Sequence, residues 1–217
     1  MAAETLRFDD ALVDAIVVQA LQPNNHELLR RLAKVLGITS ASNVLLIADQ
    51  ADISGSILES ELHCTVTHYG GDLRRLPFAD QRFDTAIVAV PVAKQFHALA
   101  RELHRVLKPN GTLGMVAFSL YRDQMPDDPA LIDRVSPLLA TSRPAAAYRA
   151  VLAESGFTAF VSQERGREVR RTALDTYRQH MLNQRATDRP ADPAAQALEL
   201  LAAGGIAITL ITAEKAD

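Results

Sequence analysis

Short, unbroken apolar runs alternate with amphipathic segments along the middle of the chain. The runs at 43–48, 83–90 and 112–118 have strand length and predict strands that are covered on both faces. Segment 93–108 lies between the last two and predicts a helix with one apolar stripe, made by Phe96, Leu99, Leu103, Val106 and Leu107. A strand, a helix and a strand at this spacing predict a parallel βαβ unit with a right-handed crossover.

The flanking segments predict further helices and strands. Two helices come first, at 8–21 and 26–36, and Gly37 ends the second. A short helix that ends near Leu62 is expected to begin with a capping box of Ser56 and Glu59. The remaining expected elements are strand 64–69, turns at 70–71 and 109–111, helix 145–156, strands 157–164 and 206–215, and helical stretches at 130–139, 171–185 and 194–203.

These elements predict an α/β fold with a doubly wound, mostly parallel, Rossmann-like sheet and helices on both faces. We expect one domain over 1–217. Residues 1–42 would form an N-terminal helical extension, 43–119 the Rossmann-like core, and 120–217 a C-terminal half with a cap-like segment and the last strands.

Composition narrows the protein's class and location. The chain has 217 residues, of which 48% are hydrophobic and 23% charged, as in ordinary globular proteins. Its net charge of −3 supplies no general attraction to nucleic acid or to anionic membranes, so neither is expected as a partner. The single cysteine, Cys64, and an acidic start without the features of a signal peptide indicate a cytoplasmic protein. The apolar stretch 11–21 is broken by Asp14 and Gln19 and is too short to span a bilayer.

One long segment carries family motifs at family spacing. These are Gly71-Asp72, Leu76-Pro77-Phe78, Phe83-Asp84, and the run Glu102, Arg105, Val106, Leu107, Lys108, Pro109 and Gly111. In this segment the chain resembles the class I S-adenosylmethionine-dependent methyltransferases, in particular the type 11 group that includes quinone-ring methylases. The resemblance covers roughly 43–215, is strongest over 70–119, and implies that the last strand is antiparallel.

The resemblance fails where the family binds its cofactor. In the family the first strand ends in an acidic residue and enters a glycine-rich loop; here Leu46 stands at the acidic position, and Ala48, Gln50 and Asp52 stand at the glycines. Glycine allows positive φ and leaves room for the cofactor at such positions. The chain also has one strand-like segment, 64–69, where the family has two strands and a helix, so the ribose-binding acid of the second strand is missing.

The candidate site residues follow from the resemblance. If S-adenosylmethionine binds, we expect Ala48, Asp49, Gln50, Asp72, Leu73 and Val90 to contact it. Asp72 matches the position that faces the adenine, although it is equally suited to a turn that satisfies backbone amides. No catalytic residue can be assigned. No metal is expected, because His63, Cys64 and His68 lack a fourth ligand at a recognised spacing.

Three functions remain open. The favoured hypothesis is a methyltransferase-like protein that has lost S-adenosylmethionine binding, needs no cofactor and acts as a non-catalytic binding, regulatory or partner subunit. A homodimer or another protein partner could use the N-terminal helices, where Val13, Ile16, Val17, Val18 and Leu21 spread over more than one stripe. The alternative is an active small-molecule methyltransferase with a remodelled cofactor loop. A cyclase or isomerase on this scaffold is the third hypothesis, and it has no identifiable acid–base pair.

Overall fold

The computed structural model describes residues 25–48, 54–89, 95–120, 143–164 and 206–216. The chain divides into two compact units. One comprises Asn24–Ala117, Pro144–Glu164 and Thr209–Asp217, and the fold below is that of this unit. The expected helices at 8–21, 130–139, 171–185 and 194–203 lie outside the described residues. One domain over 1–217 stays a prediction.

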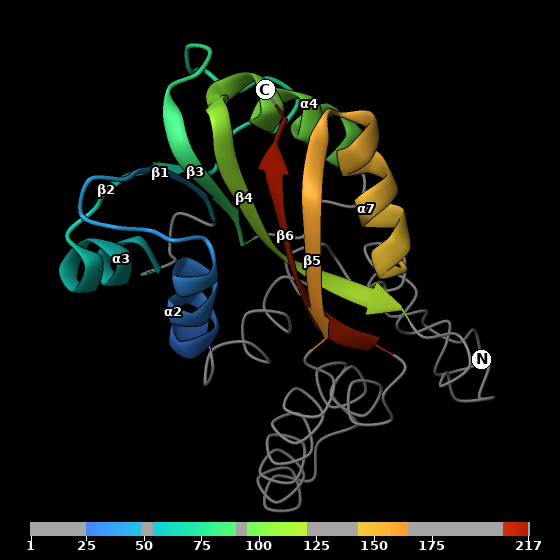
Figure 1. The fold of residues 1–217 in the computed structure, drawn as a ribbon, viewed down its shortest axis with the longest axis horizontal. Helices are drawn as coiled ribbons and strands as arrows, with labels where there is room; N and C mark the ends of the chain where they lie inside the picture. The colour runs from blue at the N-terminus through green and yellow to red at the C-terminus, as the bar shows by residue number, and fades with distance from the viewer. Residues whose placement is uncertain (1–24, 49–53, 90–94, 121–142, 165–205, 217) are drawn as a thin grey trace, which may run out of the picture. The chain divides into compact units, whose positions relative to one another are not determined.

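A six-stranded sheet forms the centre of the described unit (Figure 1). Its strand order is β2-β1-β3-β4-β6-β5. β1 pairs in parallel with β2 and β3, β3 pairs in parallel with β4, and β5 pairs antiparallel with β6. The strands are β1 (Asn43–Ile47), β2 (Thr65–Tyr69), β3 (Phe83–Val88), β4 (Leu107–Leu120), β5 (Phe157–Glu164) and β6 (Ile206–Lys215).

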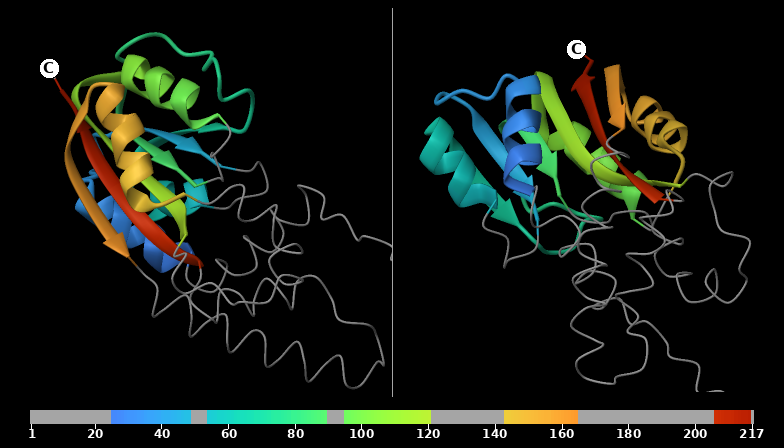
Figure 2. Two further views of the ribbon diagram at one scale, coloured as in Figure 1. Left: turned by 90° about the vertical axis from the view of Figure 1, so that its right-hand side faces the viewer. Right: turned by 90° about the horizontal axis from the view of Figure 1, so that it is seen from below.

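Helices cover both faces of the sheet (Figure 2). They are α2 (Asn25–Val35), α3 (Ser54–Leu62), α4 (Phe96–Val106) and α7 (Ala145–Glu154). β1 shows the division most clearly, because Leu45 and Ile47 join the core of α4 and α7, whereas Val44 and Leu46 join the core of α2 and α3. The predicted α/β fold with a mostly parallel sheet and an antiparallel last strand is confirmed.

Most expected elements are present, with two corrections. The capping box at Ser56 is wrong because α3 begins two residues earlier, at Ser54. The first turn of α3 packs on β2 so closely that a Cβ at Gly55 would collide with the imidazole of His68. Gly37 and Gly156, both at positive φ, follow α2 and α7 as predicted.

The expected turn at 109–111 lies inside a strand. β4 pairs with β3 at Leu107, loses register over the next four residues, and resumes at Thr112. Asn110 has φ of 60° in this bulge, and a Cβ at Gly111 would lie 2.8 Å from the carbonyl oxygen of Lys108. The sequence predicts a turn here. The structure has a bulge instead, because β3 pairs with β4 both before it, at Leu107, and after it, at Thr112.

The sheet has fewer strands beyond β1 than the family that the sequence resembles. Residues 54–89 are all described, and between β1 and β3 they contain α3 and β2. β2 is therefore an edge strand, which confirms the expectation of one strand in this region. After Tyr69 the chain enters an irregular loop, 70–82, that leads directly to β3.

The contact of Leu36, the residue after α2, with β4 gives a test of the packing. A Cβ at Gly114 would lie 2.6 Å from Cδ1 of Leu36. We expect Gly114→Ala to lower the free energy of unfolding by about 1–3 kcal/mol, because overpacking forces neighbouring side chains off their rotamers. In a Leu36→Ala background the same substitution should cost clearly less. Urea denaturation followed by circular dichroism measures this double-mutant cycle, and an equal cost in both backgrounds would contradict the contact.

Candidate functional site

The carboxyl ends of parallel strands are where open α/β sheets bind ligands. Here this edge includes the ends of β1, β2 and β3, with Ala48, Tyr69 and Ala89 as the described residues that end or follow the strands. The backbone N–H of Ala48 donates to the carbonyl of Tyr69 at 3.3 Å, and that of Ala89 donates to the carbonyl of Ile47 at 2.8 Å. Asp49, Gln50 and Val90, three of the six predicted cofactor residues, lie outside the described residues.

Ala48 fills the first of the family's glycine positions without strain. Its side chain is 3% exposed and belongs to the core cluster of α2 and α3. The methyl group therefore adds apolar contact to that core. The replacement of glycine by alanine at this position fits the fold.

Asp72 is held by its neighbour. The backbone N–H and Nε of Arg74 both donate to Oδ1 of Asp72 at 3.0 Å, and Nη2 donates to Oδ2 at 3.0 Å. These bonds, the side-chain bond from Arg74 foremost, hold the pKa of the Asp72 carboxyl below its ordinary value. The geometry is that of a turn residue that satisfies a backbone amide. Leu73, the next predicted contact, is half-buried and packs against the core of α4 and α7.

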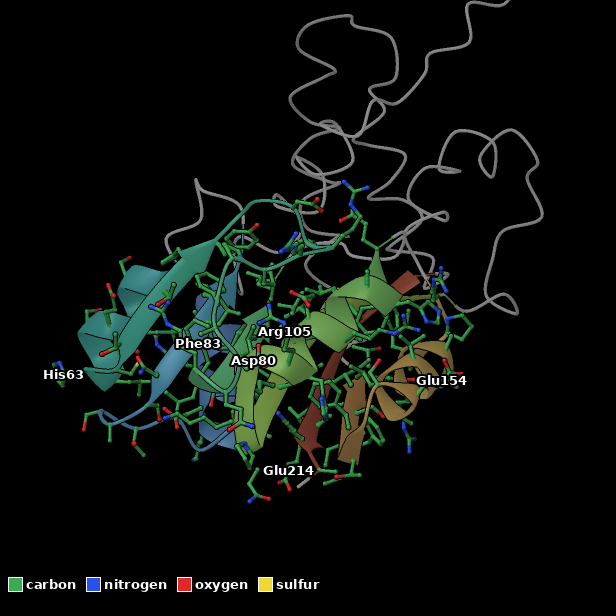
Figure 3. The ribbon with its side chains drawn as sticks, turned by 90° about the horizontal axis from the view of Figure 1, so that it is seen from above. His63, Asp80, Phe83, Arg105, Glu154 and Glu214 are labelled. Atoms are coloured by element: carbon green, nitrogen blue, oxygen red, sulfur yellow. The ribbon has the colours of Figure 1, made fainter. Side chains whose placement is uncertain are left out.

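The loop at 70–82 is clamped to α4 by one carboxylate and one guanidinium. Arg105 donates through Nη1 to the carbonyl of Phe78 and to Oδ1 of Asp80, both at 2.7 Å, and through Nη2 to the carbonyl of Leu76 at 3.0 Å (Figure 3). Glu102 accepts bonds from Arg105 at 2.7 and 3.0 Å and from the backbone N–H of Leu76 at 2.8 Å. We call Glu102 and Arg105 the α4 clamp. Its bonds lower the pKa of Glu102 and raise that of Arg105, so both stay charged.

A second ion pair joins the first residues of β1, β3 and β4. Lys108 Nζ lies 2.7 Å from Oδ1 of Asp84, whose Oδ2 accepts the backbone N–H of Asn43 at 2.9 Å. Burial opposes the charge on Asp84, but these two partners hold its pKa below the ordinary value. Asp84, Glu102, Arg105 and Lys108 are all family motif residues, and all of them hold elements of the fold together.

The described residues do not fit the ribose of S-adenosylmethionine, the cofactor that the resemblance implies. A ribose needs an acceptor for its hydroxyls at the end of the second strand. β2 ends at Tyr69, whose hydroxyl donates to the carbonyl of Asp72 at 3.1 Å, and two glycines follow. Asp72 is the acidic residue next to this end, and its two oxygens are bound by Arg74.

The described residues show no alternative reactive centre. They contain no group of three or more histidine, cysteine or acidic residues that could hold a metal ion. Cys64 is buried with Sγ 3.6 Å from the carbonyl of Leu58, and burial raises the pKa of its thiol. No helix in this part of the chain is long and apolar enough to cross a membrane.

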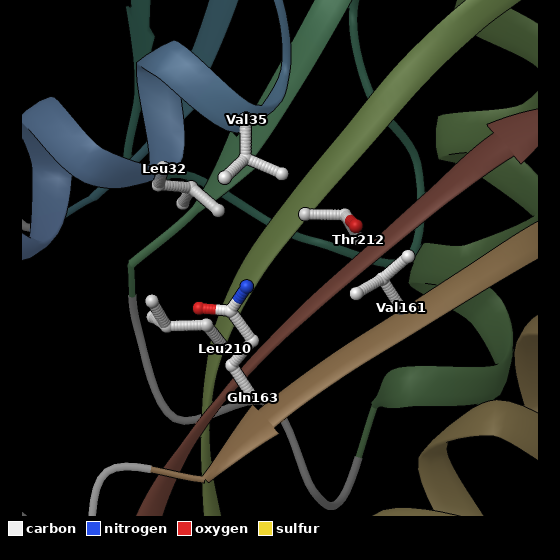
Figure 4. Close-up of a pocket in the computed structure, with 6 residues that line it drawn as sticks. All are labelled: Leu32, Val35, Val161, Gln163, Leu210 and Thr212. Atoms are coloured by element: carbon white, nitrogen blue, oxygen red, sulfur yellow. The ribbon is translucent and has the colours of Figure 1, made fainter.

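The structure adds a hollow that sequence reasoning missed (Figure 4). Leu32 and Val35 of α2 form one side, and the lining is completed from β5 and β6 by Val161, Gln163, Leu210 and Thr212. Val35 and Val161 are each 49% exposed. None of the six side chains titrates, so the hollow offers packing but no acid–base pair. Its residues come from segments about 130 and 180 positions apart, and no local pattern marks them.

Comparison with known proteins finds one family model and short stretches of similarity. Residues 23–115 match the methyltransferase domain family. A stretch of 57 residues is 40% identical to the uncharacterized protein Rv1405c of Mycobacterium tuberculosis, and an uncharacterized protein of Mycobacterium bovis matches equally. The match covers 25% of this chain and 21% of each relative, so the chain spans about a fifth of these proteins.

Solved structures show the same fold at low identity. Phosphoethanolamine N-methyltransferase 2 of Haemonchus contortus, solved with S-adenosylhomocysteine, has a TM-score of 0.74 at 12% identity and covers 96% of this chain, which spans 58% of that enzyme. Geranyl diphosphate C-methyltransferase from Streptomyces coelicolor A3(2) has a TM-score of 0.62 at 14% identity; the match covers 99% of this chain and 88% of that enzyme. The cyclase SpnF has a TM-score of 0.64 at 18% identity; the match covers 90% of this chain and 82% of SpnF. The resemblance to class I methyltransferases is confirmed as a shared fold.

The α4 clamp can be tested with a matched pair of substitutions. We expect Arg105→Lys to lower the free energy of unfolding by about 2 kcal/mol, because a lysine ammonium cannot replace the guanidinium fork that joins Glu102, Asp80 and two carbonyls. Arg101→Lys makes the same exchange at an exposed position of α4 and should change stability little. Urea denaturation followed by circular dichroism measures both. Equal, small effects would contradict the role of the clamp.

Proposed function

We propose that this chain is a methyltransferase-like protein that does not bind S-adenosylmethionine and acts as a non-catalytic binding, regulatory or partner subunit in the cytoplasm. The observation that carries the proposal is the end of β2, where the described residues offer no acid at the position of the family's ribose-binding carboxylate, and the nearest acid is already paired. Asp72 is paired with Arg74 through both carboxylate oxygens. The strand itself ends at Tyr69 and two glycines follow it, so among the described residues the end of β2 supplies no carboxylate for the ribose hydroxyls.

The loss of these contacts would weaken binding strongly. Hydrogen bonds to a charged group contribute about 1.5–3 kcal/mol each, and a bidentate ribose contact would forfeit two of them. A loss of about 3–6 kcal/mol raises a micromolar dissociation constant by about two to four orders of magnitude. In the sequence, Gln50 and Asp52 stand at two further positions where the family has glycine, which leaves room for the cofactor.

A second candidate, an active methyltransferase with a remodelled loop, is favoured by one observation. The side chains of Arg74 and Asp72 are 70% and 50% exposed, and exposed ion pairs contribute only about 0–1 kcal/mol. Asp72 could therefore exchange Arg74 for a ligand at little cost. The α4 clamp would keep the rest of the loop, 76–82, fixed during that exchange.

Isothermal titration with S-adenosylmethionine and S-adenosylhomocysteine separates the two candidates. We expect no binding heat up to millimolar ligand for the folded chain and for Arg74→Ala, in which the carboxylate of Asp72 is released. Micromolar binding by the unmodified chain would contradict the proposal. Binding that requires Asp72, tested with Asp72→Asn, would establish the second candidate in its place.

A further inference from the structure

In the part of the chain that the structure describes, β2 is an outer strand of the sheet and carries none of the usual features that block pairing. β1 occupies one side of the strand, and among the described residues no strand pairs with the other side. Natural edge strands are usually protected by charged residues, proline or bulges. The residues of β2, Thr-Val-Thr-His-Tyr, include none of these and have high β propensity.

The backbone groups that point outward can be identified from the ladder with β1. The N–H of Thr65 donates to Ser42, and the carbonyl of Tyr69 accepts from Ala48. Because these groups alternate along a strand, the N–H and C=O groups of Val66 and His68 point away from the sheet. They lie two residues apart, with Thr67 between them.

We propose that a second copy of this chain pairs with β2 through its own β2, in antiparallel orientation about a two-fold axis at Thr67. In this register Val66 of each copy exchanges both backbone hydrogen bonds with His68 of the other, Thr67 faces Thr67, and Thr65 faces Tyr69. The second copy then occupies the side of β2 where the related family has further strands. The proposal does not depend on whether the cofactor binds.

An identical strand meets no charge repulsion in this register. A residue on a two-fold axis meets itself, so a charged residue there would repel its copy; position 67 is an uncharged, half-buried threonine. β5, at the opposite edge of the sheet, differs from β2 because charged groups lie on it: Glu164 at its end, and Arg149 over the ring of its Phe160.

Charge reversal at the axis tests the proposal on the full-length chain. We expect analytical ultracentrifugation to show a concentration-dependent dimer for the unmodified chain. Thr67→Lys and Thr67→Asp should each weaken the dimer by about tenfold or more, because like charges then lie directly opposite each other. When the two variants are mixed, opposite charges face each other and a heterodimer should form. A pull-down detects it, because the tagged variant then retains the untagged one.

The heterodimer also excludes misfolding as the cause of the weakening, because a chain that fails to fold would not recover on mixing. Thr158→Lys makes the same substitution at an exposed position of β5, the other edge strand, and should leave the dimer unchanged. A monomer at all concentrations, or a dimer that Thr67→Lys does not weaken, would overturn the proposal. A dimer weakened equally by Thr158→Lys would also overturn it.

Discussion

The hydrogen bonds between Arg105 and the loop at 70–82 join the parts of this fold that carry its most specific sequence motifs. The guanidinium reaches Glu102 on its own helix, the carboxylate of Asp80, and the carbonyls of Leu76 and Phe78. An irregular loop leaves many backbone groups without partners, and five donors in a rigid fork can satisfy several at once. With the loop fixed, Phe78 packs edge-on against Tyr69 and Phe83, which links the edge strand to the centre of the sheet.

Four of the family motif residues are not among the six residues expected to contact the cofactor. Asp84, Glu102, Arg105 and Lys108 hold elements together, and their bonds to protein atoms need no ligand. A chain can therefore keep the family's strongest motifs while its cofactor loop changes. Methyltransferases and the cyclase SpnF share this fold with the chain at low identity, so the fold alone does not specify a reaction.

Sequence patterns predicted the elements of the described fold well and its side-chain contacts poorly. Buried strands such as β1 and β3 are continuous apolar runs, and α4 has a clear stripe, so periodicity was sufficient to place them. The capping box at Ser56 and the turn before Thr112 were wrong because packing of α3 on β2, and pairing with β3, decide those boundaries. The pairing of Asp72 with Arg74 depends on side-chain directions in a loop, which no periodic pattern encodes.

The central claim is the proposal that the carboxyl ends of β1, β2 and β3 do not bind S-adenosylmethionine. Amide hydrogen exchange of the full chain, with and without millimolar S-adenosylmethionine, tests it most directly because it reports where a ligand acts. The account predicts unchanged exchange at the end of β1, in α3 and over residues 69–76. Slower exchange at the ends of β1 and β2 in the presence of the cofactor would contradict it.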